Sequence, residues 1–170
     1  QAGDAQSLAL RERLGADAVS LARVRMNMAR TLIEAGRADA AQALITAATA
    51  ARQQVLAPDH PDQVQAPVLR LLSAVALGAA EDVASNLVVL RAALAGAITG
   101  MSPLQQSQVE LAIAQGELSL QGTDSASEFA ASAHQRRTQL FPAGHPMLAQ
   151  SALVWASARW PLAITSKRRN

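Results

Sequence analysis

Residues 26–48 read MNMARTLIEAGRADAAQALITAA, and this stretch decides the fold. An apolar helical pattern leads into a turn marked by the only glycine of the stretch, and a second helical pattern follows it. In that second pattern Ala41, Leu44, Ile45 and Ala48 follow the spacing i, i+3, i+4 and i+7, which places them on one face of an α-helix. The stretch therefore predicts two helices joined by a tight turn.

The pattern of this stretch recurs along the chain with a period near 42 residues. Apolar residues that close a helical pattern recur at this interval, namely Leu14, Leu56, Ile98 and Leu140. Each begins a short segment of helix-breaking residues, and these segments read LGADAV, LAPDHPDQV, ITGMSPLQ and LFPAGHPML. Glycines mark the middle of each unit, at Gly36, Gly78 and Gly122. One such helix pair cannot bury its apolar face alone, so we expect the pairs to stack, each contacting mainly its neighbours.

The period divides the chain, which we treat as one domain, into three complete units and two incomplete ones. The complete units span residues 15–57, 58–99 and 100–142. The segment SLALRERLGADAV resembles the end of a second helix, so we assign residues 1–14 to a preceding unit. A final partial unit spans residues 143–160, and a tail follows at 161–170.

Prolines and small polar residues mark where the first helix of each unit begins. Pro61, Pro103 and Pro146 fall near one offset in their units, where a proline opens a helix without losing a needed hydrogen bond. The predicted N-caps beside them are Asp59, Asp62 and Ser102. Pro67 interrupts the first turns of the helix in the unit at 58–99, so we expect that helix to start later or to bend there.

The last helix of the array needs a cap over its open apolar face. Residues 146–159 form one more first helix, which Pro161 stops. We expect Trp155 and Trp160 to pack on the open face, because terminal repeats must cap the array and large aromatic side chains bury much area. The alternative is that the two tryptophans form a stacking surface for a ligand.

The repeat resembles the tetratricopeptide repeat superfamily, in the 42-residue form of kinesin light chain and of many bacterial multidomain proteins. The segments that carry the resemblance are ALRERLGADAV, VLAPDHPDQV, LFPAGHPML and the stretch at 26–48. The resemblance covers nearly the whole chain and is weakest in the second complete unit, where Leu71 or Leu72 stands in place of a small residue. It implies an all-α, right-handed superhelical solenoid of antiparallel helix hairpins.

The resemblance also implies a function. Members of the superfamily are scaffolds that bind a protein or peptide along a concave groove lined by the first helices. Bacterial repeats of this form are similar to C-terminal modules of serine/threonine kinases and regulators, which would place the chain in a larger signalling protein. The compartment stays open between cytoplasm and periplasm, and would be extracytoplasmic in a membrane-anchored kinase. This inference is analogy at the level of the fold.

The polar stripe of the first helices predicts which residues line such a groove. The predicted lining is Arg23, Asn27, Arg30, Gln65, Leu69, Leu72, Gln108 and Gln115, with Ala112 between the last two. The guanidinium groups favour a peptide with an acidic group near the first complete unit, because arginine forms bidentate pairs with carboxylates. The alternative for each residue is a helix face exposed to solvent with no ligand.

The sequence carries no pattern of a catalytic, cofactor or metal site. It has three histidines and neither cysteine nor tyrosine, so we expect no enzyme activity and no cofactor. His60 and His145 each precede a proline in equivalent segments, which favours a role at a helix start over a metal pair. We expect His134 at the edge of the core, and Glu110 and Glu117 on a solvated surface.

Charge and hydropathy narrow the partners. The formal net charge is only +2, and the one basic run, Lys167 to Arg169, lies at the end of the chain, which argues against nucleic acid as a partner. No apolar stretch approaches the roughly 20 residues of a membrane helix, so we expect no membrane insertion by this segment. The alternative function is structural, a spacer or self-association domain that forms homo-oligomers through its open ends.

Overall fold

A computed structural model of the chain describes the backbone of residues 2–160 and the side chains of residues 18–160. The described part is all-helical, as the sequence predicts, and contains no strand. The tail at 161–170, with its basic run and Pro161, lies outside the described residues. The α-helices are α1 (Ala2–Glu34), α2 (Ala38–Gln53), α3 (Gln65–Leu77), α4 (Ala80–Ala92), α5 (Pro103–Ser119), α6 (Thr123–Leu140) and α7 (Pro146–Arg159). A 3₁₀ helix, η1 (Pro61–Val64), precedes α3, and a π-helix, η2 (Ala93–Ala97), follows α4.

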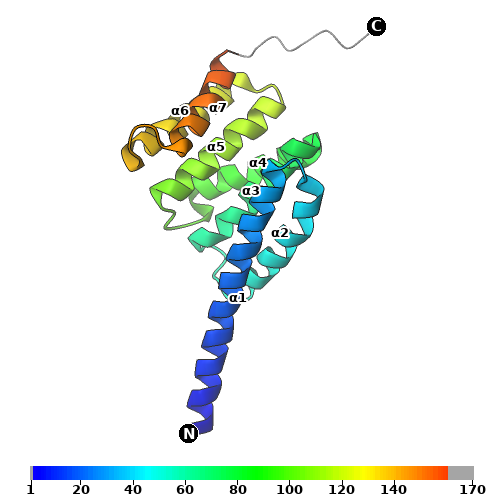
Figure 1. Cartoon of the computed structure of the whole chain (residues 1–170), viewed down its shortest axis with the longest axis vertical. Coiled ribbons are helices and arrows are strands. Elements are labelled where there is room, and N and C mark those ends of the chain that lie inside the picture. The colour runs from blue at the N-terminus through cyan, green and yellow to red at the C-terminus, as the bar shows by residue number, and fades with distance from the viewer. Residues whose placement is uncertain (1, 161–170) are drawn as a thin grey trace.

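The helices pack mainly against their neighbours in the chain (Figure 1). Helices α1 and α2, α3 and α4, and α5 and α6 form three packed pairs, and α7 packs on α6. The odd-numbered helices also contact one another in succession, from α1 to α3, α5 and α7. These contacts are compatible with a repeated array of helix pairs in which the odd-numbered helices form one continuous layer.

Helix α1 differs from the expectation at its N-terminal half. It runs without interruption through residues 14–19, so the expected break after Leu14 is absent. This segment contains Gly15 but no proline, and one glycine inside a helix of good helix formers costs only about 1 kcal/mol. The N-terminal half of α1 extends beyond the other helices (Figure 1).

The turns inside the helix pairs use left-handed backbone at equivalent positions. Gly36 and Gly78 have φ values of +74° and +68°, as the sequence predicts for turn glycines. In the third pair the expectation for Gly122 is wrong, because the left-handed residue is Gln121, with φ of +66°. Gly122 serves close packing instead, since a Cβ atom there would lie 2.5 Å from Oε2 of Glu117.

The helix starts follow the prolines, but two predicted N-caps are wrong. Each of the three prolines opens its helix, and Ser102 caps α5 in a capping box with Gln105. The N-cap before Pro61 is His60 rather than Asp59 or Asp62, because its Nδ1 accepts a hydrogen bond from the backbone N–H two residues later. His145 caps α7 in the same way, which confirms the helix-start role of both histidines. As expected from Pro67, regular α-helix starts late in this unit, at Gln65.

The core consists of three apolar clusters in chain order. The first lies between α1, α2 and α3, the second between α3, α4 and α5, and the third between α5, α6 and α7. Ala29, Ala41 and Ala48 are fully buried in the first cluster, which confirms that small residues allow a close helix approach there.

The even-numbered helices bury the same four register positions. These positions are Ala41, Ile45, Ala48 and Arg52 in α2, Val83, Leu87, Leu90 and Leu94 in α4 and its continuation, and Ala126, Ala130, Ala133 and Arg137 in α6. All are buried except Leu94, which is half-buried and packs against the second cluster. Two of the three helices therefore end their buried face with an arginine and the middle one with a leucine.

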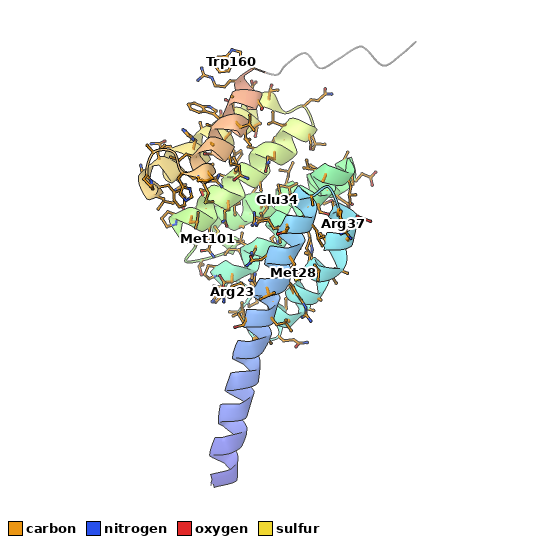
Figure 2. All side chains as sticks on the ribbon, viewed as in Figure 1. Arg23, Met28, Glu34, Arg37, Met101 and Trp160 are labelled. Atoms are coloured by element: carbon orange, nitrogen blue, oxygen red, sulfur yellow. The ribbon has the colours of Figure 1, made fainter. Side chains whose placement is uncertain are left out.

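The expected cap of the array is half correct. Trp155 is partly buried against the third cluster, with its ring centroid 5.6 Å from that of His134. His134 itself is half-buried and bonded to Ser151, as expected at the edge of a core. Trp160 stands at the outer end of α7 with 67% of its surface exposed (Figure 2), so the expectation that it packs is wrong. The reason is that no further helix of the described chain covers that side of α7.

Candidate functional site

A small cavity lies where the odd-numbered helices face α6. Residues from α1, α3, α5, α6 and α7 line it, so it draws on every part of the array: Arg30, Val68, Leu72, Gln108, Leu111, Ala112, Gln115, Arg137 and Gln150. About 20 Å³ of it is open to the centre of a water-sized group, which is room for roughly one such group. The structure thus brings together Arg30, Leu72, Gln108 and Gln115 of the predicted groove lining, with Ala112.

The other four predicted residues do not line this cavity. Arg23 and Asn27 are exposed on α1 toward its N-terminal end (Figure 2). Gln65 is half-buried, and its Oε1 accepts a hydrogen bond from Arg52. Leu69 is fully buried in the first cluster, so its side chain does not reach the surface as the groove prediction requires.

The strongest polar feature of the cavity is the buried guanidinium of Arg137, which is only 2% exposed. Its Nε donates to Oγ of Ser107 at 3.3 Å, and its Nη1 donates to the carbonyl of Met147 at 2.9 Å and to Oε1 of Gln150 at 3.0 Å. These bonds tie α6 to α5 and to the first turns of α7. They hold the side chain in one orientation at the wall of the cavity.

A second arginine occupies the equivalent position in the first helix pair. Arg52 is 3% exposed, and it donates to the carbonyl of Asp62 at 2.6 Å and to Oε1 of Gln65 at 2.8 Å. A shift of 85 residues converts Arg52, Asp62 and Gln65 into Arg137, Met147 and Gln150. The same joint between an even-numbered helix and the next odd-numbered one is therefore built twice.

The two joints differ in the electrostatics around the arginine. Desolvation by burial lowers the pKa of Arg52, and the charge of Asp62 opposes this shift. Desolvation also lowers the pKa of Arg137, and there the nearby Arg30 guanidinium lowers it further. Arg137 thus faces a like charge across the cavity, where Arg52 has an opposite charge close by.

No carboxylate balances these two guanidinium groups at the cavity. None of its lining residues is acidic. Within the described residues Glu110 is paired with Arg136 and Glu117 with Arg91. Glu110 is only 4% exposed and also accepts from Ser132, so the expectation that these glutamates form a solvated surface is wrong. The reason is that α6 brings Arg136 and Ser132 over the face of α5 that carries Glu110.

A larger cavity, of about 350 Å³, lies on α2, α3 and α4. Its walls include Leu56, Pro67, Val89 and Ile98, and its polar residues are glutamines, Thr49 and Arg70. Arg70 Nη2 donates to Oγ1 of Thr49 at 3.4 Å, so this pair is already bonded. The cavity is mainly apolar and has no set of converging charges.

The described residues contain no group of three or more histidine or carboxylate side chains that would hold a metal ion. No helix in the same part of the chain is long and apolar enough to cross a membrane.

Two cavity residues were missed by the sequence prediction, namely Arg137 and Gln150. The prediction took the lining only from the first helices of the complete units, so an arginine from α6 and a glutamine from the final α7 were left out. The signal that finds them is the 85-residue shift, which relates them to Arg52 and Gln65.

We compared the chain with models of known protein families, with curated proteins and with solved structures, and none of them matches. The functional argument therefore rests on the cavity and on the repeated architecture.

Proposed function

We propose that the chain is a tetratricopeptide-like solenoid that binds a peptide segment of another protein along its odd-numbered helices. The role is recognition and not catalysis. The observation that carries the proposal is the meeting of predicted groove residues from three different helices, Arg30, Leu72 and Gln108, at one cavity. Membership of a larger bacterial signalling protein rests on the resemblance alone.

The chemistry of the cavity suits a peptide. Small-molecule sites are usually larger enclosed pockets of several hundred Å³, whereas this cavity admits about one water-sized group. It therefore suits one terminal group of a side chain, with the rest of a ligand lying across the neighbouring helices. The lining combines leucine and alanine side chains with amides and guanidinium groups, so it offers both apolar contact and hydrogen bonds.

The experiment is selection from a displayed library of random peptides, followed by affinity measurement on two matched variants. Gln115→Trp fills the cavity from α5, and Gln139→Trp makes the same change at an exposed position of α6 outside the lining. We expect selected peptides to lose about tenfold or more in affinity for Gln115→Trp, a loss of at least one good contact, and to retain their affinity for Gln139→Trp. Failure to enrich any peptide, or equal losses in both variants, rejects the proposal.

Self-association is a second candidate, and the two ends of the array favour it. Leu21, Val24 and Met28 are about half exposed along one face of α1, and Leu153 and Trp160 are 69% and 67% exposed on α7. Exposed apolar stripes of this kind are typical of surfaces that meet a partner. Light scattering over a range of concentrations separates the candidates, because stacking through these ends raises the mass as concentration rises, whereas peptide binding does not require it.

A further inference from the structure

We propose that the cavity between α1 and α6 is a site for one carboxylate group of an acidic peptide, held between Arg30 and Arg137. The inference rests on the proposed peptide-binding function and names the chemistry of its ligand. It adds a residue from an even-numbered helix to a groove that the sequence assigned to first helices alone.

Arg137 has a free donor at this cavity. Its Nε and Nη1 are both bonded, but Nη2 donates no hydrogen bond to any described residue. Among the described side chains the only fully buried polar atom without a partner is Nε of Arg52, so Nη2 of Arg137 reaches solvent. Because Arg137 lines the cavity and is otherwise enclosed, that solvent is the cavity itself.

Arg30 supplies the second positive charge. It is half-buried on α1 and lines the same cavity, and it makes no hydrogen bond or ion pair with the described residues. The amides of Gln108 and Gln115 line the cavity from α5 and are likewise free to donate. A cavity with two guanidinium groups, free amide donors and no acid attracts an anion, since charged hydrogen bonds contribute more than neutral ones.

The size of the cavity selects the anion. The room for about one water-sized group matches one carboxylate oxygen, while a phosphate group would need to place more oxygen atoms there. A carboxylate bound here bridges the first and third helix pairs, because Arg30 belongs to α1 and Arg137 to α6. It also relieves the repulsion between two like charges, so binding is expected to stiffen the array as well as to fix the peptide.

The test uses Arg30, because the bonds of Arg137 make its variants liable to misfold. In the intact chain, acetate is titrated at constant ionic strength while the side-chain Nε–H signals of the arginines are followed by NMR. We expect saturable shifts at Arg30 and Arg137, weakened about tenfold in Arg30→Gln and restored in Arg30→Lys. Arg23→Gln is the matched control, because Arg23 is exposed on the same helix and lies outside the cavity. Inorganic phosphate is expected to bind more weakly than acetate.

Peptides from the display selection then separate the sources of the carboxylate and the two proposals. We expect selected peptides to contain Asp or Glu and to lose about tenfold in affinity when that residue becomes an amide. Binding that survives C-terminal amidation identifies a side chain, and binding that requires the free terminus identifies a terminal carboxylate; both support the site. Peptides that are sensitive to Gln115→Trp but indifferent to their own acids and to Arg30→Gln overturn the carboxylate site and leave the peptide-binding function standing. Acetate binding without any enriched peptide overturns the peptide ligand and the proposed function together.

Discussion

The two outer joints of the array and its middle joint solve the same problem with different chemistry. At the outer joints, from α2 to α3 and from α6 to α7, a buried arginine bonds the first turns of the next helix. At the middle joint, from α4 to α5, the same register position is Leu94, which packs into an apolar cluster. Surface hydrogen bonds complete the middle joint, from Thr99 to Asp59 and from Gln105 to Asp62.

The difference follows from the size of the residues that precede these positions. Buried alanines dominate α2 and α6, whereas α4 buries Val83, Leu87 and Leu90. Leucine burial contributes about 2 kcal/mol per side chain, and alanine much less. An alanine-rich helix packs closely but with little apolar area, so directional bonds from its final arginine are needed to fix the next helix. The middle helix obtains its stability from apolar area and needs no arginine.

The largest expected effect comes from removing the arginines. Arg137→Ala is expected to lower the free energy of unfolding by about 3 kcal/mol, because it opens a cavity and leaves the Ser107 hydroxyl and the Met147 carbonyl without their donor. Arg52→Ala is expected to cost about 2 kcal/mol, since Arg52 makes fewer bonds and its Nε has no partner to lose. Chemical denaturation followed by circular dichroism measures both.

The middle joint provides the control for this prediction. Leu94→Ala is expected to cost about 1 kcal/mol, because Leu94 is only half-buried and its removal leaves no polar group without a partner. If Leu94→Ala costs as much as Arg137→Ala, the arginines act only by filling space and the contrast between the joints fails. Arg137→Met separates volume from hydrogen bonds, and it is expected to recover less than half of the loss caused by alanine.

A smaller effect is expected at the helix starts, where the outer units share a histidine cap and the middle unit uses serine. His145→Ala and His60→Ala are each expected to cost about 1 kcal/mol, since each removes an acceptor for a backbone N–H. Asparagine in place of either histidine is expected to restore most of this loss, as a good N-cap. His145→Ala also removes the ring that stacks on Phe141 at a centroid distance of 4.2 Å.

Thermal unfolding of the alanine and asparagine variants measures these differences. Loss of the same size in the asparagine variants shows that the histidines act through stacking and not as caps. Ser102→Ala is the comparison in the middle unit, and it is expected to cost about as much, because Ser102 forms a full capping box.

Helix type, helix starts and most turns follow from the sequence, because periodicity and prolines act locally. The groove prediction was less accurate for a physical reason in the middle unit. The 3₁₀ helix η1 has about three residues per turn and not 3.6, so it changes the rotation of the chain entering α3. The sequence shift from Asn27 therefore led to Leu69, which points into the core, while Arg137 on the opposite helix was not considered.

The smallest expected effect tests how far the likeness of the outer units extends. The shift of 85 residues relates Gly36 to Gln121, and both have left-handed backbone with φ of +74° and +66°. A side chain in this conformation costs about 1 kcal/mol relative to glycine, so Gln121→Gly is expected to raise the free energy of unfolding by about 0.5 to 1 kcal/mol. The reciprocal change Gly36→Gln is expected to lower it by about 1 kcal/mol, and nothing lies within 4 Å of a Cβ atom there to add a clash. Opposite signs in a denaturant series make the two turns equivalent in energy as well as in register, whereas a loss in Gln121→Gly shows that the third turn depends on its glutamine side chain.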